Sequence, residues 1–285
     1  NIIPTPHNYL SILKQASENN SIVPTEEVKF INHSWHIFQL NDYASRNDFL
    51  ILTQGVQSDK LNSIVVATNQ AAIFIEPGAN ILPCYLNAAT GPIYISKGAT
   101  IMEGSMIRGP FFLGADSVVK MGAKIYGATS IGARCVVGGE IKNSILFDNS
   151  NKAHDGYLGD SVLGEWCNLG AGTSNSNVKN TAGVVGYKIN KDDVVGFSGN
   201  KGGLLMGDYS RSAINTSFNT GSVVGVCCNI FGEIMPPKFI ENFTWGKEKY
   251  IFDKALKDIN NWMAFKNEFL SQKDELKLKK LYEKI

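Results

Sequence analysis

Residues 95–137 read ISKGAT IMEGSM IRGPFF LGADSV VKMGAK IYGATS IGARCV V, with an aliphatic residue at the start of every group of six. These positions are Ile95, Ile101, Ile107, Leu113, Val119, Ile125, Ile131 and Val137. A period of six fits neither the 3.6 residues of an amphipathic helix nor a single alternating strand. It predicts short strands stacked coil upon coil in a β-helix.

A second regularity concerns corners. The residue four places after the aliphatic one is small or modest in size, at Ala99, Ser105, Ser117, Ala123, Thr129 and Cys135. Small side chains there let the chain turn tightly between strands. The sequence therefore predicts tight corners between the strands.

The repeat extends beyond the quoted stretch. It reaches upstream to Ile75 and Ile81, and after a two-residue slip it resumes at Ile145, Asn151 (a weak slot), Tyr157, Leu163 and Leu169. A third stretch comprises Met206, Ser212 (weak), Phe218, Val224 and Ile230. We therefore predict a β-helix over residues 73–235, with about nine coils and a length of ~43 Å at ~4.8 Å per coil.

The two ends of the chain lack the repeat. In residues 1–72, apolar residues from Trp35 to Leu52, followed by Gly55, predict an amphipathic helix, and we interpret this region as a linker or the remnant of an upstream nucleotidyltransferase domain. The sequence starts at Asn1 rather than Met, so a piece of a longer protein is expected. Residues 236–285 predict a helical tail that packs on the β-helix or a neighbouring subunit; a basic nucleotide-binding arm is the less favoured alternative.

The composition argues against several classes of protein. The formal net charge is +1 and 19% of residues are charged, so nucleic-acid binding is not expected. No run of eighteen apolar residues and no signal-like N-terminus occurs, so we expect a cytoplasmic protein without membrane contact. Five cysteines without paired spacing predict no disulfide framework or zinc site. His33 and His36 have no further ligand near them in sequence, so no metal is expected.

Polar residues gather around the slip in three short words. They are E-x-K-N-S at residues 140–144, H-x-x-Y-x-G-D at residues 154–160, and N-x-G-A-G-T at residues 168–173, followed by Asn177. Histidine is the side chain whose unperturbed pKa lies nearest neutrality, and lysine offers charge to an anion. The segment is therefore the candidate site of chemistry.

These words, in order and over about forty residues, resemble the acetyltransferase domain of the bifunctional N-acetylglucosamine-1-phosphate uridyltransferase/glucosamine-1-phosphate acetyltransferase family, in a variant bacterial branch. The resemblance implies a left-handed parallel β-helix of triangular coils. It also implies a homotrimer with sites between subunits, and acetyl-CoA and a sugar phosphate as substrates.

Carried over residue by residue, the resemblance assigns a general base and a set of binding residues. His154 falls on the base and Ala171 on the acetyl-CoA side, while the sugar phosphate is contacted by Lys142, Tyr157, Asn168 and Asn177. The family also carries an arginine for the phosphate, and the nearest basic candidate here is Lys124, which lacks its bidentate fork. The segment from Gly183 to Gly203 departs from the family's regular coil.

Simpler interpretations exist for these residues. His154 would then be a corner histidine bonded to the backbone, and Lys142 a solvated side chain. Tyr157 occupies an aliphatic slot of the repeat, which favours packing. Asn168 and Asn177 would then be turn-forming residues.

Two functions follow from the sequence. The first is an acetyl-CoA-dependent N-acetyltransferase that acts on an amino-sugar 1-phosphate such as glucosamine 1-phosphate. The second is a trimerisation or regulatory domain of a sugar-1-phosphate nucleotidyltransferase. A metal-dependent hexapeptide enzyme is excluded, since it needs three converging histidines and His154 is the one histidine in the predicted β-helix.

Overall fold

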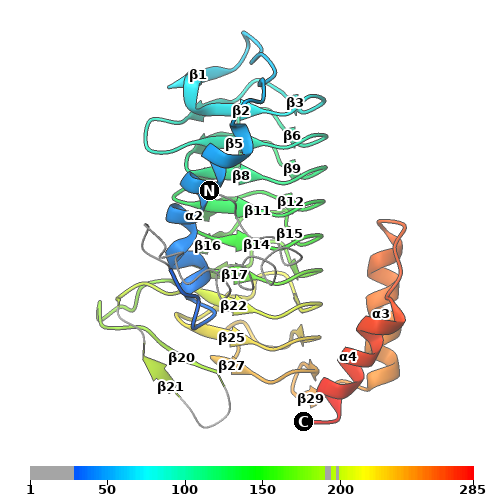
Figure 1. The fold of residues 1–285 in the computed structure, drawn as a ribbon. Coiled ribbons are helices and arrows are strands. Elements are labelled where there is room, and N and C mark those ends of the chain that lie inside the picture. The colour runs from blue at the N-terminus through cyan, green and yellow to red at the C-terminus, as the bar shows by residue number, and fades with distance from the viewer. Residues whose placement is uncertain (1–28, 190–193, 197–198) are drawn as a thin grey trace, which may run out of the picture. The chain divides into compact units, whose positions relative to one another are not determined.

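The computed structural model describes residues 29–189, 194–196 and 199–285. The chain divides into residues 1–32 and residues 33–285, and the helices and strands described here belong to the second unit. Most of that unit is a left-handed parallel β-helix, as predicted (Figure 1). The predicted linker or remnant over residues 1–72 lies partly outside the described residues.

The β-helix has three faces, each a parallel sheet in which every coil adds one strand. Face A contains β1 (Val66–Thr68), β4 (Tyr85–Asn87), β7 (Met106–Arg108), β10 (Lys124–Tyr126), β13 (Glu140–Lys142) and β16 (Tyr157–Gly159). Face B contains β2 (Ile73–Ile75), β5 (Ile93–Ile95), β8 (Phe111–Leu113), β11 (Thr129–Ile131), β14 (Ile145–Leu146), β17 (Val162–Leu163), β22 (Leu204–Met206), β25 (Ser222–Val224) and β27 (Phe239–Ile240).

Face C completes each coil. It contains β3 (Asn80–Ile81), β6 (Thr100–Ile101), β9 (Val118–Val119), β12 (Val136–Val137), β15 (Asn151–Lys152), β18 (Asn168–Leu169), β23 (Arg211–Ser212), β26 (Asn229–Ile230), β28 (Thr244–Trp245) and the antiparallel β29 (Glu248–Lys249). A short 3-10 helix, η1 (Gln70–Ala72), precedes β2. Parallel strands thus extend beyond both ends of the predicted 73–235 stretch.

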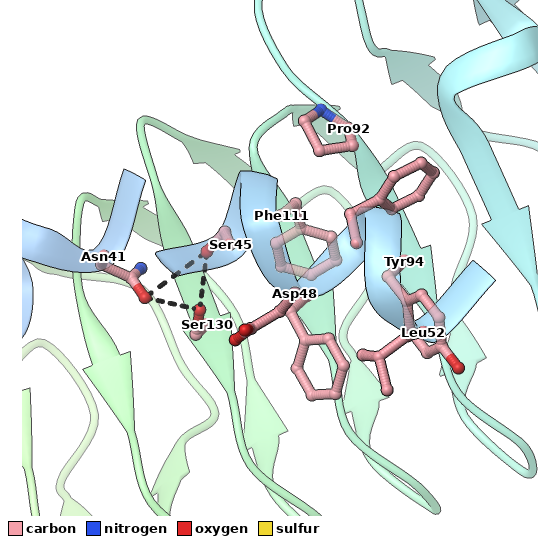
Figure 2. A pocket seen from close by; sticks show the side chains of 10 residues that line it. Asn41, Ser45, Asp48, Leu52, Pro92, Tyr94, Phe111 and Ser130 are labelled. Atoms are coloured by element: carbon pink, nitrogen blue, oxygen red, sulfur yellow. Dashed lines mark hydrogen bonds between the residues drawn. The ribbon is translucent and has the colours of Figure 1, made fainter. Parts of the chain in front are cut away.

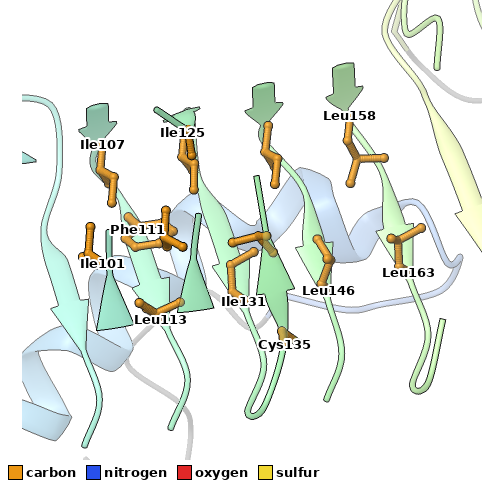
Figure 3. Close-up of a cluster of buried hydrophobic side chains, with 14 of the residues drawn as sticks. Ile101, Ile107, Phe111, Leu113, Ile125, Ile131, Cys135, Leu146, Leu158 and Leu163 are labelled. Atoms are coloured by element: carbon orange, nitrogen blue, oxygen red, sulfur yellow. The ribbon is translucent and has the colours of Figure 1, made fainter. Parts of the chain in front are cut away.

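The hexapeptide phase predicts the core correctly up to Val137. The aliphatic residues of that stretch fill the interior (Figure 3). The six small residues predicted at corners are fully buried. All five cysteines are buried and free, as expected for small core residues.

After the slip, three assignments of the phase are wrong. Leu146, Lys152 and Leu158 point into the core at the slots predicted for Ile145, Asn151 and Tyr157. The reason is a shortened coil: Val136 lies opposite Val118, eighteen residues earlier, but opposite Asn151, only fifteen residues later. Because a one-residue change of register exchanges the inward and outward side chains, Tyr157 faces outward.

The predicted N-terminal helix is α2 (His36–Thr53), and it packs on face B. Asn41 donates from Nδ2 to the Ala128 carbonyl at 2.6 Å and accepts from Ser130 Oγ at 2.9 Å. Figure 2 shows these residues at one end of a mainly apolar pocket between α2 and face B. The outward Ile145 and Val162 contribute to the same interface.

An excursion interrupts the coils between β19 (Ser174–Asn175) and β22, where the sequence departs from the repeat. It contains the antiparallel pair β20 (Gly186–Lys188) and β21 (Val194–Gly196). Tyr187 stacks on Trp35 with ring centres 5.2 Å apart, so the excursion folds back to the start of α2. The coil then resumes, since β19 pairs with β24 (Ser217–Phe218).

The C-terminal tail forms α3 (Phe252–Ala264) and α4 (Gln272–Tyr282), as predicted. Their apolar sides pack on Trp166, Cys227 and Phe243 of the last coils. Among the described residues, none of the helices combines the length and apolar character that a membrane span requires. In the same part of the chain, no three His, Cys, Asp or Glu side chains form a metal-binding group; His33 instead stacks on Trp35.

Candidate functional site

The candidate base lies at the corner where the chain passes from face C to face A. His154 is exposed between β15 and β16. Two residues before it, Lys152 projects into the core and is only 1% exposed. Its ammonium group donates to the carbonyl oxygens of His154 and of Gly138, the latter at 3.4 Å. The hydrogen bonds of the interior Lys152 therefore fix the position of the backbone at His154.

Burial lowers the pKa of Lys152 from its ordinary 10.5 to about 8, because the charged form loses hydration in the core. The nearby carboxylate of Asp155 opposes this shift but does not cancel it. Lys152 thus places a positively charged group at an interior position that is aliphatic in the preceding coils, close to the exposed His154.

Tyr157 follows His154 and lies on the outer side of face A. Its ring passes over Gly159: a Cβ on Gly159 would come within 2.2 Å of the phenol oxygen. This close approach explains the glycine of the H-x-x-Y-x-G-D word. The Tyr157 hydroxyl accepts from Asn177 Nδ2 at 3.0 Å, and burial followed by the charge of Asp160 raises the pKa of Tyr157 above its usual range.

Asp160 connects the first two sequence words with Asn177, the residue that follows the third. It is 3% exposed, accepts from Asn143 Nδ2 at 2.6 Å and accepts from Asn177 Nδ2 at 2.5 Å. Asn143 belongs to the first word, Asp160 to the second, and Asn177 follows the third. Words far apart in sequence thus meet along the edge between faces A and B.

Lys142 lies beside this edge on face A. Its Nζ is 5.8 Å from the centre of the Tyr126 ring. The Tyr126 hydroxyl donates to Glu140 Oε1 at 2.6 Å, and this hydrogen bond to a carboxylate is the main reason why the pKa of Tyr126 rises to about 12. Lys124 is exposed one coil earlier, where its strand position pairs with that of Glu140.

The same face carries an arginine that the sequence interpretation did not consider. Arg108 lines a groove of about 600 Å3 together with Lys124 and Tyr126. Because the strands of β7 and β10 are in register at Ile107 and Ile125, Arg108 and Tyr126 stand in one outward column, which continues to Lys142. The groove therefore contains a guanidinium group, with the fork of donors that Lys124 lacks.

Ala171 and His154 lie at the same corner in successive coils. The Gly172 N–H donates to the Asp155 carbonyl at 3.0 Å, and the Ala171 carbonyl accepts from Asn215 at 2.7 Å. Gly172 has a positive φ of 74°, and a Cβ there would lie 2.2 Å from Asn215 Oδ1, so the G-A-G-T word requires glycine at this position.

The structure gathers some of the predicted residues and separates another. Lys124, Lys142, Tyr157 and Asn177 lie on or at the edge of face A, with His154 and Ala171 at its other edge. Asn168 lies on face C, opposite Asn151 and Arg211. In one copy of the chain, Asn168 therefore does not share a face with Tyr157.

Sequence reasoning missed the structural roles of Lys152, Asp160 and Asn175. Asn175 fills an interior slot, and its side chain bonds both the N–H and the carbonyl of Gly159, at 2.8 and 3.0 Å. A polar residue at an interior repeat position, where the other coils have an aliphatic one, could have revealed these roles. The shortened coil shifted the interior positions, so the expected ones were wrong.

Comparison with known proteins finds relatives for part of the chain. No protein-family model matches the chain. The bifunctional protein GlmU of Methanocaldococcus jannaschii is 34% identical over 117 residues, which are 40% of this chain and 28% of that protein. The β-helix fits the left-handed acetyltransferase domain of GlmU.

Two further GlmU proteins are also similar to part of the chain. That of Methanococcus maripaludis is 33% identical over 121 residues, 40% of this chain and 28% of the relative. That of Rippkaea orientalis is 51% identical over 49 residues, 16% of this chain and 11% of the relative. The aligned part of the chain thus spans less than a third of the length of these GlmU relatives.

Proposed function

We propose that the chain is an N-acetyltransferase that moves an acetyl group from acetyl-CoA to the amino group of an amino-sugar 1-phosphate. The observation that carries this proposal is the junction at Asp160, where the first two sequence words meet Asn177 beside Tyr157. The similarity of part of the chain to bifunctional GlmU proteins supports it.

The chemistry assigns roles to the residues. The sugar amine attacks the thioester carbonyl, the N–C bond forms, the C–S bond breaks, and the thiol of CoA leaves with a proton. His154, exposed at the corner, would take the proton from the amine. Tyr157, Asn177 and Lys142 would hold the sugar phosphate, and the backbone around Ala171 would contact the acyl donor. Asn168, on face C, would contribute from a neighbouring copy.

A homotrimer is part of the proposal. Helix α2 packs on face B, and α3 with α4 packs on the last coils. On face A, Val66, Tyr85 and Met106 form an outward apolar column and are 57%, 55% and 45% exposed. Exposed apolar strips of this kind favour self-association, and closed symmetry is the usual outcome.

The test measures thiol release from acetyl-CoA by the purified chain, with and without glucosamine 1-phosphate. We expect release that requires the sugar and falls by roughly 10²- to 10⁴-fold in His154→Ala. His33→Ala is the matched control, since it removes a histidine outside the β-helix, and it should retain full turnover. Equal rates in His154→Ala and wild type would remove His154 from the mechanism.

A second candidate function is a trimerisation or regulatory domain of a sugar-1-phosphate nucleotidyltransferase. The observation in its favour is the excursion between β19 and β22, where the chain departs from the regular coils that the resemblance predicts. A trimer without any sugar-dependent thiol release would support this alternative.

A further inference from the structure

A small basic pocket lies at the edge between faces A and B, where the excursion leaves the coils. Its volume is about 290 Å3, and it is lined by Ser176, Val178, Lys179, Asn180, Thr181, Asn219, Thr220 and Lys238. Two of these side chains are cationic, and none of the described residues lining the pocket is acidic. The pocket is therefore a concentration of positive charge and hydrogen-bond donors.

The two lysines act on each other across the pocket. Burial lowers the pKa of Lys238, and the positive charge of Lys179 lowers it further. Lys179 is held in place because its ammonium group donates to the Val184 carbonyl. Two ammonium groups that repel each other are stabilised when an anion binds between them, and phosphate suits lysine as a point-charge partner.

The pocket also presents organised polar groups. Thr220 Oγ1 donates to Ser176 Oγ at 2.8 Å, and the Thr220 N–H donates to Asn219 Oδ1 at 2.7 Å. The bond from Thr220 to Ser176 joins successive coils, whereas the bond from the Thr220 N–H to Asn219 is local. Ser176 Oγ in turn donates to the Val178 carbonyl at 3.0 Å, so the scaffold fixes the positions of both hydroxyl groups beside the lysines.

The pocket and the candidate site lie on neighbouring residues of one segment. Ser176 lines the pocket and directly precedes Asn177, whose side chain bonds Tyr157 and Asp160. The Asn177 carbonyl accepts from the Gly202 N–H at 2.8 Å, so the end of the excursion is held at the same edge.

We propose that the pocket formed by Lys179, Lys238, Ser176 and Thr220 binds the phosphate group of a substrate. The ligand class is a phosphate monoester, supplied either by the sugar phosphate or by the nucleotide part of the acyl donor. The identity of these two sources rests on the proposed function, whereas binding of phosphate itself does not.

The experiment is isothermal titration calorimetry of the full chain with three probes: inorganic phosphate, glucosamine 1-phosphate and adenosine 3′,5′-bisphosphate. The pocket variant is Lys179→Met with Lys238→Met. The control is Lys257→Met with Lys273→Met, which removes two exposed lysine charges from α3 and α4. We expect the pocket variant to lose at least about tenfold in affinity for one organic probe, and the control to lose none.

The probe that loses affinity identifies the source of the phosphate. The charge-retaining variant Lys238→Arg should preserve binding, which separates loss of charge from misfolding. Equal affinities in the pocket and control variants for all three probes would overturn the inference. If phosphate binding depends on the pocket but the chain transfers no acetyl group, the inference holds and the proposed function is refuted. If the chain transfers acetyl groups normally but the pocket variant binds all three probes as the wild type does, the proposed function holds and the inference is refuted.

Discussion

Two neighbouring parts of one β-helix use the same interior slot in opposite ways. Val137 and Lys152 lie opposite each other on β12 and β15, and both point into the core. The coils up to Val137 bury aliphatic residues at a constant spacing, whereas the coils from Gly138 to Asn177 are shortened and bury Lys152 and Asn175. The first part supplies stability; the second gives up core regularity to build polar corners.

The difference shows what a solenoid needs in order to carry a site. A stack of identical coils presents the same corner repeatedly, and no corner differs in chemistry. Shortened coils and interior polar groups make the two edges of face A unlike the other corners, with His154 at one edge and Asp160 at the other. Each interior polar group is hydrogen-bonded to backbone, which keeps its burial tolerable.

The largest expected effect comes from moving the lysine into the regular part. Val119→Lys would place an ammonium group between Ile101 and Val137, its aliphatic register partners, and we expect the free energy of unfolding to fall by roughly 3–5 kcal/mol. Val119→Met is the matched control, which adds volume without charge and should cost less, about 1–3 kcal/mol. Urea denaturation measures both. A lysine tolerated at residue 119 as well as methionine would show that the two regions do not differ.

The next effect is the pH dependence that Lys152 contributes. Its pKa is about 8 in the folded chain and about 10.5 when unfolded. Between these values the unfolded chain binds the proton that the folded chain has released, so stability rises with pH across this window. The free energy of unfolding of the wild type, relative to that of Lys152→Met, should therefore rise by at most about 3 kcal/mol from pH 8 to 10.5. A constant difference across the window would mean that the lysine keeps its charge in the core.

A smaller effect concerns the glycine under Tyr157. Gly159→Ala would place a methyl group against the Tyr157 ring and displace its hydroxyl from Asn177. We expect the KM for the sugar phosphate to rise about tenfold, with kcat less affected. Gly183→Ala, in the excursion, is the matched control. An unchanged KM in steady-state assays of Gly159→Ala would exclude Tyr157 from substrate binding.

The smallest effect is expected from Tyr157→Phe. It removes one hydrogen bond to Asn177 but keeps the ring and its packing. The loss should be about 1 kcal/mol in substrate affinity, or roughly fivefold in Kd. Calorimetry with glucosamine 1-phosphate measures it. A larger loss than in Gly159→Ala would reverse the proposed order of importance.

The sequence predicts the scaffold better than the site. Aliphatic residues at eight successive repeat positions and six small corner residues specify the coils up to Val137. Each repeat position there has the same surroundings in every coil and so takes the same kind of residue. The repeat placed Tyr157 at an inward position, but its side chain faces outward because the coil before it is three residues short. Polar and apolar residues alternate without a clear pattern in that segment, so the sequence does not show by how many residues the repeat shifts. Asp160 was present in a recognised word, but its partners Asn143 and Asn177 come from other coils and are revealed by the fold alone.

The most direct test of the central claim is a crystal structure of the chain with glucosamine 1-phosphate and CoA. The account predicts a sugar that lies along Tyr157 and Asn177, with its amino nitrogen within about 3.5 Å of the His154 imidazole. A sugar bound away from the corner of His154, or a corner that stays empty at saturating ligand, would contradict it.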